Sequence, residues 1–130
     1  MRLDLSDVPD FELFKEKWLK YIKNHCEEAD DSECLIWNVA QKRGYSYIQC
    51  GYKFENGKTL YKRTSAHKLV FMLHNNIKTV PPRLEISHLC HKSLCCNAHH
   101  LTMETHKKNT KRQKCKRDDI CQDCQPPCIL

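Results

Sequence analysis

The chain is poor in the residues that usually build and shape an apolar core. Its 130 residues include only 3 glycines, and aromatic residues make up 8% of the total. No apolar run approaches the length of about 18 residues that a membrane-spanning helix needs. The first residues, Met-Arg-Leu-Asp-Leu, lack the apolar segment of a secretory signal. We therefore expect no membrane insertion and a reducing, intracellular compartment, in which cysteines tend to bind metal rather than pair.

Cysteine and histidine are abundant instead, with 10 and 8 residues respectively. A chain of this length buries only about two thirds of its unfolded surface, which leaves a small core. Such chains are commonly stabilised by metal ions or by disulfides. Metal binding is favoured here, and a secreted, disulfide-rich protein is the alternative.

Charge is distributed unevenly within a net charge of +6. Residues 1–34 carry a net charge of −5, and the remainder carries +11. Seven Lys or Arg and no acidic residue lie between Lys107 and Arg117. A basic run of this kind is typical of a phosphate-binding surface or a nuclear-import signal, and a solvated helix face is the alternative. It predicts nuclear localisation and DNA contacts from Lys107, Lys108, Lys111 and Arg112.

Hydrophobic periodicity and turn residues predict one mixed α+β domain over residues 1–130. A first helix, capped by Ser6 or Asp7 and with Pro9 in its opening turn, is expected to reach His25, and an acidic loop follows over 27–33. Strands are expected over 35–39, 45–54, 60–64 and 84–88, and a helix over 66–73. A final helix starts at Thr102 or Thr105 and runs to 113. The chain divides into a first segment (1–33), a sheet and helix (34–86), a histidine- and cysteine-rich loop with the final helix (87–113) and a cysteine-rich end (114–130).

Two groups of cysteines have the spacing of metal ligands. Cys90, Cys95 and His100 lie within eleven residues, which suits tetrahedral zinc, and Cys34 is the candidate for the fourth ligand. Near the C-terminus, four further cysteines supply a second set on their own: Cys115, Cys121, Cys124 and Cys128. The C-x-x-C at 121–124 has a redox alternative, but that motif normally follows a strand at a helix start. We interpret Cys26, Cys50 and Cys96 as ordinary thiols.

His88 and Asn109 flank the first cysteine group. A strand, a metal-bound loop and a helix would bring the imidazole and the amide together. This pair suits phosphodiester hydrolysis, because neutral His takes a proton from water and an amide oxygen holds a hard cation such as Mg²⁺. The alternative is a histidine that only caps or bridges the loop.

The segment from Ser87 to Leu101, with the sequence SHLCHKSLCCNAHHL, closely resembles the His-Cys box homing endonucleases. These belong to the ββα-metal, or His-Me finger, nucleases. The resemblance continues in register through Glu104, Asn109 and Cys115, and Tyr61-Lys-Arg-Thr64 resembles the strand before the box. The resemblance implies a small zinc-stapled ββα-metal fold with an antiparallel DNA-binding sheet.

The resemblance implies that His88 is the general base and that Asn109 is the direct protein ligand of a catalytic Mg²⁺. Two structural zinc ions would be held by the two cysteine sets, with Cys124 standing where the family has histidine. Lys58 falls roughly where the family has an arginine near the scissile phosphate. The products would be 5′-phosphate and 3′-hydroxyl ends.

The implied partner is double-stranded DNA, whose major groove accepts a two-stranded ribbon. Gln49, Lys53, Lys58 and Lys62 of the expected hairpin would contact it, while the hairpin tyrosines pack the small sheet. Family members dimerise through a tail beyond the last zinc ligand, and this sequence ends two residues after Cys128. A monomeric nicking enzyme or a differently built homodimer is therefore expected. The alternative function is a catalytically silent, zinc-containing DNA-binding module of the transcription-regulator kind.

Overall fold

The computed structural model describes residues 3–29 and 33–129, and it confirms the mixed α+β class. Helices and paired strands alternate along the chain: α1 (Phe11–Asn24), β1 (Cys26–Glu28), β2 (Leu35–Trp37), β3 (Gln41–Lys42), β4 (Tyr45–Ser46), β5 (Ile48–Lys53), β6 (Thr59–Thr64), α2 (Ala66–His74), β7 (Leu84–His88), η1 (Ala98–His100), β8 (Leu101–Thr105) and α3 (His106–Asp118). Each strand pair in the described residues is antiparallel. None of the described helices has both the length and the apolar character that crossing a membrane requires.

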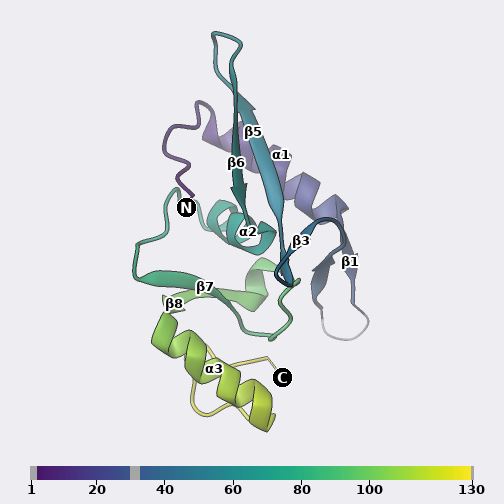
Figure 1. The fold of residues 1–130 in the computed structure, drawn as a ribbon, viewed down its shortest axis with the longest axis vertical. Helices are drawn as coiled ribbons and strands as arrows, with labels where there is room; N and C mark the ends of the chain where they lie inside the picture. The colour runs from purple at the N-terminus through teal and green to yellow at the C-terminus, as the bar shows by residue number, and fades with distance from the viewer. Residues whose placement is uncertain (1–2, 30–32, 130) are drawn as a thin grey trace.

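Figure 1 shows an elongated arrangement of these elements. The β5–β6 hairpin projects at one end with α1 beside it, and α2 lies in the middle. Strands β7 and β8 cross below α2, and α3 forms the opposite end. The predicted acidic loop is partly a strand, because β1 pairs with β2. Residues 30–32 of that loop lie outside the described residues.

Helix α1 begins later than its predicted caps. Asp10, not Ser6 or Asp7, is the N-cap, and its carboxylate accepts a hydrogen bond from the Leu13 amide at 3.1 Å. The reason is that the preceding segment forms a β-bridge at Asp4 and a turn at Ser6-Asp7, and it buries Leu3, Leu5 and Val8 in the core. The predicted helical face is confirmed by burial at a spacing of four residues, from Phe14, Trp18 and Ile22.

The main core lies between α1, α2 and the inner face of the β5–β6 hairpin. Helix α2 contributes Leu69, Met72 and Leu73, which are fully buried. The hairpin turns at Asn56-Gly57 as predicted, and the φ angle of +84° at Gly57 suits glycine. The predicted strand over 45–54 is instead two strands, β4 and β5, which pair with different partners.

Strands β7 and β8 and helix α3 form one consecutive ββα unit. β7 has the predicted bounds, whereas β8 was not predicted. Because β8 occupies residues 101–105, Thr102 is not a cap, and the Thr105 hydroxyl accepts from the Lys108 amide at 3.3 Å. α3 runs past residue 113 to a left-handed Asp119, since Cys115 on its last turns is fully buried.

Candidate functional site

A cleft of about 550 Å³ lies along the edge of β7 that β8 does not pair. His88 enters it from the end of β7, and His67 enters from α2. Asn109 and Lys116 enter it from α3. The fold therefore brings His88 and Asn109, which are 21 residues apart, into the lining of one cleft.

The His88 ring is oriented by a backbone carbonyl. Its Nε2 lies 3.1 Å from the Cys95 carbonyl oxygen. Because a carbonyl can only accept, Nε2 carries the proton and donates, which leaves the Nδ1 lone pair as an acceptor. Burial lowers the pKa of His88 and favours this neutral form.

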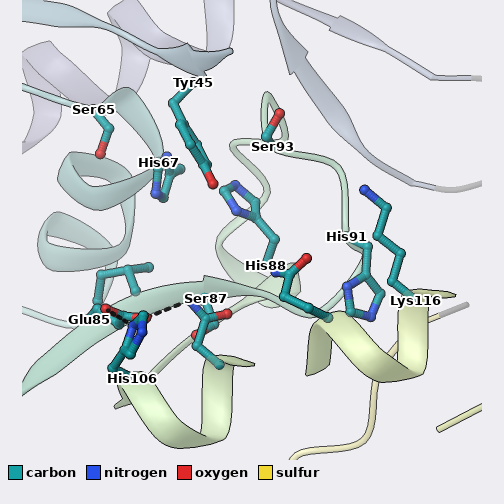
Figure 2. Close-up of a pocket in the computed structure, with 13 residues that line it drawn as sticks. Tyr45, Ser65, His67, Glu85, Ser87, His88, His91, Ser93, His106 and Lys116 are labelled. Carbon is teal, nitrogen blue, oxygen red and sulfur yellow. Dashed lines mark hydrogen bonds and ion pairs between the residues drawn. The ribbon is translucent and has the colours of Figure 1, made fainter. Parts of the chain in front are cut away.

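Figure 2 shows His67 and Tyr45 beside His88 in the cleft. The His67 and His88 ring centroids are 4.3 Å apart. Burial, followed by the charge of His88, lowers the pKa of His67 to about 3. The sequence gives no signal for this neighbour, because the contact depends on how α2 packs against β7. His67 and Tyr45 are thus cleft residues that the sequence analysis missed.

Asn109 is held by a carboxylate that the sequence analysis also missed. Its side-chain Nδ2 donates to Glu85 Oε1 at 2.6 Å. His106 Nδ1 lies 3.2 and 3.3 Å from the two oxygens of the same carboxylate, as Figure 2 shows. The sequence did contain a pattern for the side of α3 that lines the cleft. Its residues recur at intervals of three or four, as on one face of a helix: His106, Asn109, Gln113 and Lys116.

Lys58 does not reach this cleft. It lies in the turn after β5, and β6 separates it from the cleft by six residues of strand, or about 20 Å. Figure 1 places that turn at the far end of the molecule from β7 and α3. The cationic side chain that lines the cleft is Lys116 instead.

The hairpin separates the residues predicted to contact DNA onto two faces. Gln49 and Lys53 are exposed on the outer face of β5. Lys62 is on the inner face, where its ammonium lies 3.2 Å from the Asp7 carboxylate. The register puts Arg63 opposite Gln49, and the Arg63 Nε donates to the Gln49 side chain at 3.3 Å. Arg63 is therefore an outer-face cation that the sequence analysis missed.

The basic residues of α3 also differ in their exposure. Lys107, Lys108 and Lys111 are exposed. Arg112, predicted to contact DNA, is 1% exposed, so that prediction is corrected. Its guanidinium donates two hydrogen bonds to Glu104, at 2.6 and 2.9 Å, because α3 turns this side of the helix against β8.

The first predicted zinc set is assembled in the fold. The ligand atoms of Cys34, Cys90, Cys95 and His100 all lie within 4.8 Å of one another. His100 Nδ1 is 3.4 Å from the Cys34 sulfur and 3.6 Å from the Cys95 sulfur. These separations fit a zinc tetrahedron, whose bond lengths of about 2.1 Å to nitrogen and 2.3 Å to sulfur give an N···S edge of about 3.6 Å.

The second predicted set is equally compact. Its four sulfurs, from Cys115, Cys121, Cys124 and Cys128, lie within 4.8 Å of one another. The Cys115 and Cys124 sulfurs are 3.7 Å apart, which fits the tetrahedral edge of about 3.8 Å between thiolates. Backbone amides of Cys128 and Cys124 lower the pKa of Cys121 to about 7, which favours the metal-binding thiolate.

None of the ten cysteines forms a disulfide in the structure, which gives the disulfide-rich alternative no support. Cys26, Cys50 and Cys96 belong to neither cluster, as predicted. Zinc fits both clusters in ligand type, ligand number and spacing. Each cluster could therefore hold one zinc ion.

Comparison with known proteins agrees with this geometry. The family model for the zinc-binding loop region of homing endonuclease matches residues 33–130, which contain both cysteine clusters and the ββα unit. Among curated proteins, no match to the chain is found. No solved structure matches it either. Because the family match covers well over half of the chain, the protein belongs to the homing endonucleases that carry this zinc-binding loop, the His-Cys box family that its sequence resembles.

Proposed function

We propose that this protein is a divalent-metal-dependent DNA endonuclease that hydrolyses phosphodiester bonds and leaves 5′-phosphate and 3′-hydroxyl ends. The observation that carries the proposal is the single cleft lined by His88 and Asn109 in a chain of this family. Membership supports nuclease activity, and the cleft supplies groups that could perform it.

His88 would be the general base. Its Nε2 is engaged by the Cys95 carbonyl, so Nδ1 is left to take a proton from a water molecule. Because Cys95 is also in the first zinc cluster, the metal site would fix both the loop and the orientation of the base. A positioned base of this kind contributes roughly 10²–10⁴-fold to a rate.

Asn109 would hold Mg²⁺ or another hard divalent cation. Its Nδ2 is engaged by Glu85, which leaves Oδ1 as a donor of the type that such cations prefer. When bound, the cation would act as a Lewis acid and stabilise the departing oxygen. Lys116 at the same cleft would attract the phosphate backbone through its charge.

DNA contacts would come from two exposed basic surfaces. The outer face of the hairpin offers Gln49, Lys53 and Arg63, and a two-stranded ribbon fits the major groove. The exposed lysines of α3 would bind phosphates, although Lys108 and Lys111 face the C-terminal segment and not the cleft.

A plasmid-relaxation assay with the zinc-loaded protein tests the proposal. Mg²⁺ should be left out in the control, rather than removed with a chelator that would also take zinc. We expect nicked or linear DNA only with added divalent cation, and ends that a DNA ligase reseals directly. Binding with strong salt dependence but no cleavage with Mg²⁺ or Mn²⁺ would instead indicate the catalytically silent module.

A further inference from the structure

The Glu85 carboxylate occupies an unusual position beside Asn109. It lies on β7 directly opposite Glu104 of β8, and both side chains face α3. Like charges directly opposite one another destabilise an antiparallel pair. Glu104 is neutralised by Arg112, whereas Glu85 lies at the cleft beside an uncharged amide and the exposed His106. The stability of the β7–β8 pair therefore does not explain why a glutamate stands at position 85.

The contact between Glu85 and Asn109 selects one orientation of the amide. At 2.6 Å the carboxylate oxygen accepts from Nδ2, because two oxygens without a proton would repel at that separation. The amide plane is thus fixed, and Oδ1 is directed away from Glu85. His106 contacts both carboxylate oxygens, which restricts rotation of the Glu85 side chain.

A negative charge in a cleft meant for a DNA phosphate would oppose binding unless a cation lies between them. Glu85 and Asn109 both line the cleft that contains His88. We propose that Glu85 is the positioning residue of the divalent-cation site, which holds the Asn109 amide so that Oδ1 faces the cation. This inference rests on the function proposed above, and deepens it by adding a residue outside the zinc-binding and general-base sets.

The test measures cation binding directly, with Mn²⁺ as the probe and the zinc-loaded full chain as the protein. Paramagnetic broadening of cleft ¹⁵N signals gives a Mn²⁺ dissociation constant without any cleavage. The variants are Glu85→Ala, Glu85→Gln and Asn109→Ala, with Glu16→Ala on the exposed side of α1 as the matched carboxylate control. Zinc content and circular dichroism verify that each variant is folded.

We expect Glu85→Ala to weaken Mn²⁺ binding roughly 10- to 100-fold, as loss of a partner that orients a metal ligand typically does. Glu85→Gln keeps an oxygen that accepts from Nδ2, so its binding should stay within about threefold of the parent. The half-saturating Mg²⁺ concentration in plasmid cleavage should shift in the same order, and Glu16→Ala should leave both unchanged.

Three results would overturn the inference in distinguishable ways. Unchanged binding in Glu85→Ala, with loss in Asn109→Ala, removes the role of Glu85 but leaves the proposed function intact. Equal losses in Glu85→Gln and Glu85→Ala mean that the carboxylate acts by charge or as a ligand, and not by positioning. Unchanged binding in Asn109→Ala contradicts the proposed cation site itself.

Discussion

At the scale of single residues, the hydrogen bond from His88 to the Cys95 carbonyl links the candidate chemistry to a metal cluster. One residue supplies its sulfur to the first cluster and its backbone oxygen to the imidazole. A change in that loop would therefore disturb zinc binding and the orientation of His88 together. His88 itself can be changed without removing a zinc ligand.

Replacing His88 by alanine should lower the DNA cleavage rate roughly 10²–10⁴-fold, because the proposed general base is lost. Zinc content and DNA affinity should stay close to those of the parent protein. The measurement is single-turnover plasmid cleavage at saturating Mg²⁺. His74→Ala, an exposed histidine on α2, is the matched control. A rate that His88→Ala leaves unchanged would exclude this role.

Site residues were predictable from the sequence mainly where they lie at short, regular intervals along the chain. The second cysteine set and three members of the first follow from short intervals along the chain. Cys34 is distant in sequence from the other three ligands of the first set, yet the fold assembles both sets as predicted. Glu85 and His67 were missed because their contacts depend on the packing of β7 against α3 and α2. Arg112 was misassigned because a run of basic residues does not reveal which member faces Glu104.

At the scale of elements, α3 carries two different functions on its two sides. Asn109 and Lys116 line the cleft, while Arg112 and Cys115 are buried against β8 and the C-terminal segment. Removing Arg112 would leave the Glu104 carboxylate buried without a partner. A neighbouring exposed lysine offers no such contact.

Arg112→Ala should destabilise the folded protein by about 3–5 kcal/mol, because one partner of a buried ion pair is removed. The adjacent Lys111→Ala should change the free energy of unfolding by no more than about 0.5 kcal/mol. Chemical denaturation of the zinc-loaded proteins measures both. Equal stability in the two variants would show that Arg112 is exposed in solution.

The two faces of the hairpin should differ in their contribution to DNA binding. Lys53→Ala should weaken DNA binding and reduce the slope of log affinity against log salt by about one, because an outer-face phosphate contact is lost. Lys62→Ala should leave that slope unchanged, since its ammonium is paired with Asp7. Salt titrations of binding to a DNA duplex distinguish the two. The reverse result would contradict the assignment of DNA binding to the outer face.

Element boundaries were less predictable than element types. Alternation predicted β7, and alternation with the Asn56-Gly57 turn predicted the hairpin; both are present, although the predicted strand over 45–54 is divided into β4 and β5. β8 was missed because Leu101–Thr105 follows a histidine-rich loop, and it becomes a strand only by pairing with β7. Helix α1 starts late because residues 3–8 pack into the core, which no local cap signal indicates.

At the scale of the whole molecule, the apolar core reaches the strands of the ββα unit but not its helix. The core gathers around α1, α2 and the hairpin and includes Ile86 of β7 and Leu101 of β8, whereas α3 buries only Arg112 and Cys115. We therefore expect the position of α3 to depend on the second cysteine cluster. A structural zinc ion contributes on the order of 10 kcal/mol to folding, which is comparable to the stability of a whole domain.

Cys124→Ser should release one zinc ion and increase amide hydrogen exchange over α3 and the C-terminal segment. Exchange over α1 and α2 should change little, since their buried side chains form a separate cluster. Hydrogen exchange with mass spectrometry measures this by segment. Uniform protection across the variant would show that α3 does not depend on the second cluster.

We propose that two zinc ions hold together the cleft that His88 and Asn109 line. Native mass spectrometry of the purified chain tests it most directly, because one spectrum gives the metal content and the oligomeric state together. We expect two zinc ions per chain, and both should be lost together with the folded charge-state distribution when the protein is acidified. A folded chain without zinc, or one lighter by the hydrogens that disulfide formation removes, would contradict it.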